Sequence, residues 1–158
     1  MIVKIERLIR HKPIITIILG LVLISFYIAF PQYVIATKSM DPTMPPGSYV
    51  VSFRFAYLFS EPSSKDIVIF EPVEGISKYD WTHRVISTAG ETVLIRTDKG
   101  RNDTDDRFEA LADGATVDVP EGYVYQSGDA KSSFHGFANV GLIKGKVLFH
   151  FMPFWSKK

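Results

Sequence analysis

The sequence has 158 residues, enough for one modest domain with a membrane segment, and its mean hydropathy of +0.10 is slightly high for a soluble protein. The formal net charge is +1, from 18 basic and 17 acidic residues, and no basic stripe is interleaved with aromatics, which argues against a nucleic-acid partner. Cysteine is absent, which excludes disulfides, thiolate zinc sites and a cysteine nucleophile.

The first feature in chain order is the uncharged apolar run PIITIILGLVLISFYIAF at residues 13–30. Its length is close to the roughly 20 residues that a helix needs to cross a bilayer. Four lysines and arginines precede the run within residues 4–12, whereas no charge follows it before Lys38. By the positive-inside rule, this asymmetry predicts a transmembrane anchor in the cell membrane at 13–31, with a basic tail at 1–12 in the cytoplasm and an extracytoplasmic domain at 32–158.

Two alternatives to an anchor are a cleaved signal peptide and a buried core helix. A cleavage site of the small-x-small type does not follow the run, because Phe30, Pro31, Gln32 and Tyr33 stand there. The rest of the chain is too short to surround a core helix. Both observations favour the anchor.

Beyond Pro31, short β-branched and aromatic runs alternate with turn residues, which predicts a mainly β domain. Residues 56–59 and the aromatic-rich segment 149–155 are expected to be core strands; the alternative is an apolar rim that dips into lipid. The polar stretch 97–106 is typical of a solvated hairpin tip. The expected strands lie at residues 48–55, 66–70, 83–86, 92–96, 116–119, 122–125 and 147–151.

Four short motifs follow the apolar run in order. The first is TKSMDPTMPPGS at 37–48, which places Ser39 nine residues past the run and therefore near the bilayer surface. The later ones are DIVIF at 66–70, WTHRVISTAGE at 81–91 and VPEGYVYQSGD at 119–129. Their order and content resemble type I signal peptidases, the S26 family of serine peptidases.

The resemblance covers nearly the whole chain. It includes the S-M-x-P-T nucleophile box, the strand that follows Gly47, the D-I-V-x-F strand, the R-V-I box ending at Gly90, and the late G-D pair. The matching residues of the first and last boxes are Ser39, Met40, Pro42, Thr43, Gly128 and Asp129. Four positions depart from the family pattern: Ser48 replaces an aspartate, Lys65 a glycine, His83 a lysine and Ala130 an asparagine.

The resemblance implies a small signal-peptidase-like β-barrel or sandwich domain on one N-terminal transmembrane helix. It also implies a membrane-bound serine endopeptidase that removes signal peptides from exported proteins by cleavage after a small residue. The expected partners are the extended signal-peptide region of preproteins, bound by β-addition, the lipid bilayer and the protein-export machinery. Neither a metal nor another cofactor is expected, since the mechanism needs none.

His83 stands where bacterial members carry a lysine general base, so the site resembles the Ser-His form of the family. A serine hydroxyl needs an adjacent base that is neutral at working pH. Imidazole meets this need with its ordinary pKa near 6.5, whereas lysine needs strong desolvation. Lys38 is expected to point away from the site. His11, His135 and His150 are interpreted as structural or surface residues.

The remaining site residues follow from the resemblance. Thr37 lies two positions before Ser39, so on an extended segment both hydroxyls face the same side, and the family places the oxyanion hole at Thr37 and the backbone N–H of Ser39. Asp129 is expected either to orient His83 or to form a structural ion pair with Arg84. Asp105 and Asp106 are interpreted as surface charge.

Two other functions stay open at this point. One is a processing peptidase dedicated to a single pilin-type or conjugation-type substrate, which would share every catalytic residue. The other is an inactive membrane-tethered module that only binds peptides. The presence of Thr37, Ser39 and a usable base at position 83 favours catalysis.

Overall fold

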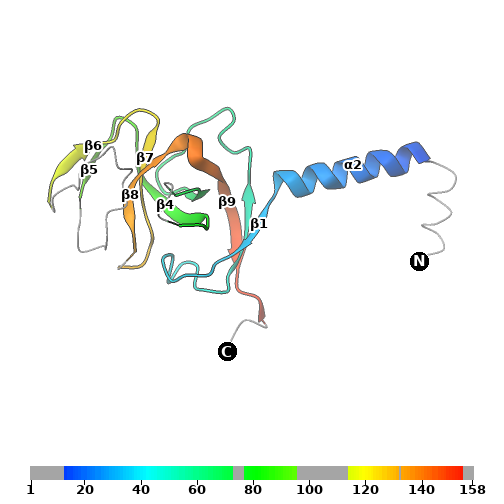
Figure 1. Ribbon diagram of the computed structural model, residues 1–158, viewed down its shortest axis with the longest axis horizontal. Coiled ribbons are helices and arrows are strands. Elements are labelled where there is room, and N and C mark those ends of the chain that lie inside the picture. The colour runs from blue at the N-terminus through cyan, green and yellow to red at the C-terminus, as the bar shows by residue number, and fades with distance from the viewer. Residues whose placement is uncertain (1–12, 73–76, 96–113, 132, 155–158) are drawn as a thin grey trace.

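The computed structural model describes residues 13–72, 77–95, 114–131 and 133–154. Within these ranges one α-helix, α2 (Pro13–Ala29), is followed by a mainly β domain, and the helix projects from one end of that domain (Figure 1). The prediction of a mainly β domain is confirmed. The strands are β1 (Gln32–Val34), β2 (Tyr49–Phe53), β3 (Ile67–Phe70), β4 (Trp81–Thr88), β5 (Thr92–Leu94), β6 (Thr116–Asp118), β7 (Tyr123–Ser127), β8 (His135–Asn139) and β9 (Ile143–Phe151).

Seven of these strands form one sheet in the order β1-β2-β9-β3-β4-β7-β8, and β5 pairs with β6 in a second, two-stranded sheet. All pairs are antiparallel. The larger sheet ends at β1 and β8, so within the described residues it is open and the closed form expected from the family resemblance is not formed. The strand β9 runs through its middle and joins the C-terminal segment to both β2 and β3.

Three groups of buried side chains form the core. The group nearest the N-terminal half contains Met40 and Met44, both fully buried, together with Ile35 and Val50. A second group lies along β3, β4 and β7, and a third connects β5 with β7 and β8. Burial on alternate positions of β2 follows from the two-residue period of a strand, which turns Val50 and Ser52 inward.

The helix α2 is joined to the sheet by backbone and aromatic contacts. The Arg54 N–H donates to the Ala29 carbonyl at 3.0 Å, and the Phe30 and Phe53 rings stack with centroids 5.3 Å apart. None of the 17 residues of α2 is buried. Among the described residues, no helix is both long and apolar enough to cross a bilayer.

Residues 56–59 correct one expectation. They lie in turns after β2 and not in a core strand, and the Phe59 side chain is 95% exposed. The C-terminal aromatics also lie outside the core: Phe149 and Phe151 on β9 are about half exposed, and Phe154 is 84% exposed. These apolar side chains therefore form surface and not core.

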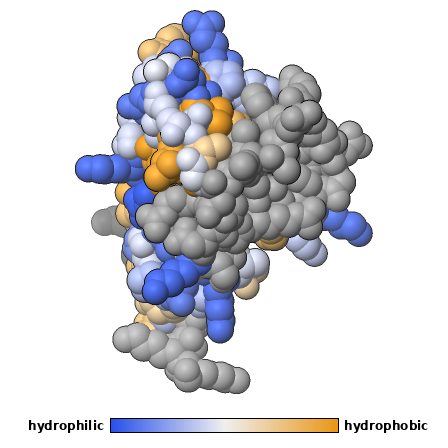
Figure 2. All heavy atoms as spheres, turned by 90° about the vertical axis from the view of Figure 1, so that its left-hand side faces the viewer, coloured by the Kyte–Doolittle hydropathy of each residue, from blue (hydrophilic) through white to orange (hydrophobic). Residues whose placement is uncertain are grey.

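The surface at the end of the domain opposite α2 differs from the apolar surface just described. Figure 2 views this end and shows mostly hydrophilic side chains among the described residues, with one smaller hydrophobic area. The polar stretch expected as a hairpin tip, at 97–106, lies outside the described residues.

Candidate active site

Ser39 lies in a turn that is anchored on the core. The next residue, Met40, is fully buried, and its carbonyl accepts a hydrogen bond from the Met44 N–H at 2.8 Å. On the other side, the Ser39 carbonyl accepts a hydrogen bond of 2.9 Å from the Ala130 N–H in the loop after β7. The backbone of Ser39 is therefore fixed from two directions while its side chain stays partly exposed.

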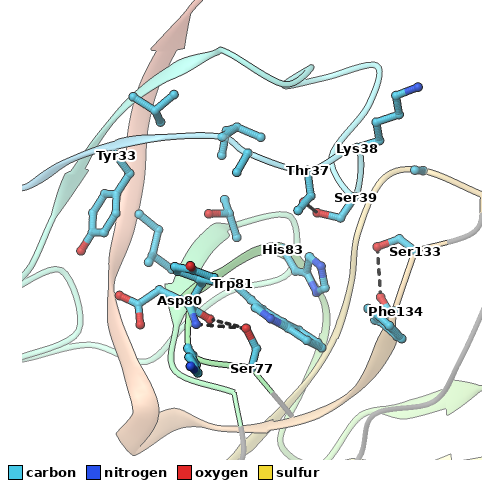
Figure 3. A pocket seen from close by; sticks show the side chains of 18 of the residues that line it. Tyr33, Thr37, Lys38, Ser39, Ser77, Asp80, Trp81, His83, Ser133 and Phe134 are labelled. Atoms are coloured by element: carbon cyan, nitrogen blue, oxygen red, sulfur yellow. Dashed lines mark hydrogen bonds between the residues drawn. The ribbon is translucent and has the colours of Figure 1, made fainter.

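Thr37 and Ser39 bring their hydroxyls together. The two oxygens, Thr37 Oγ1 and Ser39 Oγ, lie 3.2 Å apart. Figure 3 shows Lys38 pointing away from this pair. The two hydroxyls therefore meet, although residues 37–39 form a bend and a turn and not the extended segment that was expected.

His83 is the third polar residue of this region and is only 2% exposed. It lies on β4 opposite Val68 of β3 and packs with the rings of Phe70 and Trp81, whose centroids are 5.8 and 5.4 Å from its own. Its Nδ1 is hydrogen-bonded to Gln126 Oε1 at 2.5 Å. Burial lowers the pKa of His83 to about 4, and the hydrogen bond to Gln126 and the charge of Asp129 oppose that shift without cancelling it.

Ser39 and His83 line the same cavity, which has a volume of about 910 Å³. In Figure 3 they approach it from different segments, with the His83 ring on the side of Ser39 and the Trp81 ring beside it. Trp81 stacks on Phe134 with centroids 5.1 Å apart and closes one wall. Within the described residues no hydrogen bond joins Ser39 to His83, a separation common in substrate-free sites, where catalytic hydrogen bonds tighten on binding.

Asp129 and Arg84 form an ion pair. The Nε and Nη2 of Arg84 donate to the two carboxylate oxygens of Asp129 at 2.9 and 2.7 Å. The Thr43 hydroxyl also donates to Asp129, at 2.5 Å. Of the two roles that the sequence left open for Asp129, the ion pair with Arg84 is present. It joins the loop after β7 to β4, the strand of His83, and the hydrogen bond from Thr43 links the segment after Ser39 to the same carboxylate.

Lysines that line the cavity are poorly placed to act as a base. Lys38 and Lys78 are exposed, and Lys144 is held by Asp80 and Glu71 at 2.7 and 3.2 Å. These two carboxylates raise the pKa of Lys144, which keeps it protonated. Among the titratable groups that line the cavity in the described part of the chain, only His83 is buried.

Two other histidines, His135 and His150, do not line the cavity. His135 is buried and hydrogen-bonded to the Tyr125 hydroxyl at 2.5 Å, and His150 is exposed on β9. His11, Asp105 and Asp106 lie outside the described residues. In the ranges that the structure describes, no group of three or more histidine, aspartate or glutamate side chains is placed to bind a metal ion.

Gln126 is the site residue that the sequence analysis missed. It lies on β7 and is 1% exposed, and the strand expected at 122–125 ended one residue before it. One signal was available, because a polar side chain in a buried strand needs a hydrogen-bond partner. Its partner is 43 positions away in sequence, so nothing local could have identified it as His83.

Comparison with known proteins identifies the family. Residues 8–103, more than half of the chain, match the family model for signal peptidase, peptidase S26. A probable signal peptidase I-1 of Synechocystis is 30% identical over 83% of this chain and 75% of its own length, and signal peptidase I of Bacillus caldolyticus is 26% identical over 79% and 81%. Thylakoidal processing peptidase 1 of Arabidopsis thaliana is 28% identical over 75% of this chain and 41% of its own. The chain belongs to the signal peptidase family of serine peptidases, peptidase S26.

Proposed function

We propose that this chain is a membrane-bound signal peptidase in which Ser39 is the nucleophile and His83 the general base. The observation that carries the proposal is one cavity lined by the paired hydroxyls of Thr37 and Ser39 and by a buried, neutral histidine. The reaction is hydrolysis of a peptide bond between the signal peptide and the mature protein.

Catalysis then follows from the positions of three side chains. Ser39 Oγ attacks the scissile carbonyl carbon while its proton passes to Nε2 of His83, the ring nitrogen that Gln126 does not engage. The Ser39 N–H and the Thr37 hydroxyl stabilise the oxyanion, a type of donor whose removal costs about 3 kcal/mol of transition-state free energy. His83 next protonates the leaving amine, and a water molecule activated by His83 hydrolyses the acyl-enzyme.

The substrate is an extended peptide that enters the cavity between the segment before Ser39 and the start of β4. Support comes from the lining of the cavity, to which five consecutive positions before Ser39, residues 34–38, contribute. An extended peptide can add its backbone hydrogen bonds to such a segment, and the apolar wall formed by Ile35, Ile69 and Trp81 suits a small side chain next to the cleaved bond.

The membrane part of the proposal concerns residues 13–31. In this proposal they anchor the chain, residues 1–12 stay in the cytoplasm, and the mainly β domain within residues 32–158 lies outside it. The absence of charge in 13–30, the exposure of the apolar side chains of α2 and the basic residues before Pro13 all support this arrangement. The exposed aromatics Phe55, Phe59 and Phe154 are proposed to contact lipid.

The test is cleavage of a preprotein reporter with a small-x-small site by the purified full chain in proteoliposomes. Ser39→Ala and His83→Ala are each expected to lower kcat by about 10⁴-fold or more, because both remove a group that acts in the transition state. Ser60→Ala is the matched control, since Ser60 is exposed and its hydroxyl only bonds the Ala56 carbonyl. Undiminished cleavage by Ser39→Ala would rule out this serine as the nucleophile.

A further inference from the structure

The hydrogen bond between His83 and Gln126 has no part in the reaction as described above, yet it is buried on both sides. Gln126 is 1% exposed and His83 2%, and their side chains meet at 2.5 Å. They lie on adjacent strands, β4 and β7, and Gln126 is opposite Val85, two positions along from His83. The rigid sheet therefore fixes both ends of the contact.

The chemistry of the amide decides which ring nitrogen of His83 carries the proton. An amide oxygen can only accept a hydrogen bond, so Nδ1 of His83 must be the protonated nitrogen when it bonds Gln126 Oε1. In the neutral ring, Nε2 then keeps its lone pair. This is the tautomer that a base needs when its nucleophile lies on the Nε2 side.

Asp129, whose carboxylate was the other candidate for orienting His83, is bonded to other residues. Both oxygens of Asp129 accept hydrogen bonds from Arg84, and one also accepts from Thr43. A carboxylate beside the imidazole would add a negative charge and favour the protonated ring, whereas an amide orients the ring without adding charge.

We propose that Gln126 is the positioning residue of the histidine base: its side-chain oxygen holds Nδ1–H of His83, so that the lone pair of Nε2 faces Ser39. This inference rests on the proposed function of His83 as base. Burial keeps the ring uncharged, and the amide holds it without adding a charge; Asp129 after β7 is the charged group that acts on the ring, and Lys38, Lys78, Asp80 and Lys144 are the charged residues that line the same cavity.

The direct test is the tautomer of His83, measured by ¹⁵N NMR on the full chain with labelled histidine in detergent micelles, without substrate. The His83→Ala variant identifies its signals among those of the four histidines. The wild type is expected to show a protonated Nδ1 and an unprotonated Nε2 at neutral pH. In Gln126→Met, which has similar volume but no comparable acceptor, the ring is expected to populate both tautomers.

Kinetics provide the second readout. Gln126→Met is expected to lower kcat by about 10- to 100-fold, the range for losing a group that orients a functional histidine, with KM within about 2-fold. Gln126→Glu restores an acceptor and is expected to recover kcat to within about 3-fold at neutral pH, while the acid limb of kcat/KM moves to higher pH. Gln32→Met is the matched control, because Gln32 is exposed on β1 and does not line the cavity.

The outcomes separate this inference from the proposed function. If Gln126→Met keeps the Nδ1–H tautomer and the wild-type kcat, or if Gln126→Glu loses as much activity as Gln126→Met, the positioning role is wrong. If the wild type already carries its proton on Nε2, the role is also overturned. A wild-type chain with the expected tautomer whose Ser39→Ala variant still cleaves the reporter would contradict the proposed nucleophile, while the orientation of His83 by Gln126 would stand.

Discussion

At the scale of single residues, Lys65 occupies a backbone conformation that favours glycine. Its φ is 76°, and glycine is the residue that the family pattern has at this position. The conformation is held from both sides: the Lys65 N–H donates to the Val85 carbonyl at 2.8 Å, and Nη1 of Arg84 donates to the Lys65 carbonyl at 3.2 Å. A side chain in this left-handed region costs about 1–2 kcal/mol.

Lys65→Gly is therefore expected to increase the free energy of unfolding by about 1 kcal/mol, since relief of this strain exceeds the added freedom of the unfolded chain. Urea unfolding at neutral pH measures the change. Lys78→Gly, an exposed lysine with negative φ, is the control and is expected to lower stability. A Lys65→Gly variant no more stable than the wild type would show that the backbone is not strained there.

The low pKa of His83 predicts the pH dependence of cleavage. A general base acts in its neutral form, so kcat/KM should rise as pH increases through the pKa of about 4 and stay level through neutral pH. The sequence alone suggested a rise near the ordinary imidazole value, since nothing in it shows that the ring is buried. Initial rates between pH 3.5 and 8 check this, and a rise centred near 6.5 would contradict the burial of His83.

Stability must be followed over the same range. The pKa of His83 is lower in the folded chain than the ordinary 6.5 of the unfolded chain, so the unfolded state binds the proton first as pH falls. The contribution of the neutral His83 to the free energy of unfolding is intact above about pH 6.5. It is lost progressively down to about pH 4, by roughly 3 kcal/mol in total. Trp81 fluorescence reports how much of the protein is folded at each pH. A fall in activity caused by unfolding is thereby distinguished from one caused by protonation of His83.

At the scale of elements, the loop after β7 constrains the backbone of Ser39, the proposed nucleophile, through Gly128. A Cβ added at Gly128 would lie 2.4 Å from the Ser39 carbonyl oxygen and 1.9 Å from Ser133 Oγ. The hydroxyl can rotate away, but the carbonyl belongs to the backbone of the nucleophile and must move.

Gly128→Ala is accordingly expected to lower the free energy of unfolding by about 1–3 kcal/mol and kcat by about 100-fold, because displacement of a catalytic group by 1 Å has an effect of that size. Gly20→Ala on α2 is the control, since an added Cβ there has no neighbour within 4 Å. Unfolding and cleavage are measured on the same preparations. Wild-type kcat in Gly128→Ala would mean that the loop does not hold Ser39.

The strands show how far the sequence could predict the fold. Each of the seven ranges first expected as strands overlaps an observed strand, although β4 begins at Trp81 and β9 at Ile143, earlier than predicted, and β7 continues to Ser127; residues 56–59 form no strand. β1 and β8 were missed. Gln32–Val34 is three residues long, and β8 reads HGFAN, which has few strand-forming residues. β8 exists because it pairs with β7 along five residues and is buried there, which is a tertiary effect.

The candidate site could also be predicted only in part. The positions of Thr37, Ser39 and His83 on one cavity follow from motifs that the sequence carries in order. The ion pair of Asp129 with Arg84 was one of the two roles that the motifs left open, whereas Gln126, which lies 43 positions from His83, was not expected as the partner of that histidine. Contacts of this range depend on strand register, which local pattern does not determine.

At the scale of the whole molecule, the junction between α2 and the sheet joins the apolar helix to the β domain. The Ser52 N–H donates to the Pro31 carbonyl at 3.1 Å, and Phe30 stacks on Phe53. Exposed apolar side chains of Phe55, Leu58 and Phe59 follow soon after β2. An anchored α2 would therefore keep this turn close to the bilayer, and its apolar side chains could bury surface in the interface.

The absence of cysteine makes the membrane orientation directly testable, because a single introduced cysteine is labelled without background. Ser64→Cys lies in an exposed turn before β3, and Glu6→Cys lies in the basic N-terminal segment. Since basic residues are retained on the cytoplasmic side, a membrane-impermeant maleimide should label Ser64→Cys in intact cells and Glu6→Cys only after permeabilisation. Labelling in the reverse order would place the catalytic cavity in the cytoplasm, where it could not meet a signal peptide emerging on the outer face. Labelling of Glu6→Cys and Ser64→Cys from the same side would mean instead that residues 13–31 do not cross the membrane.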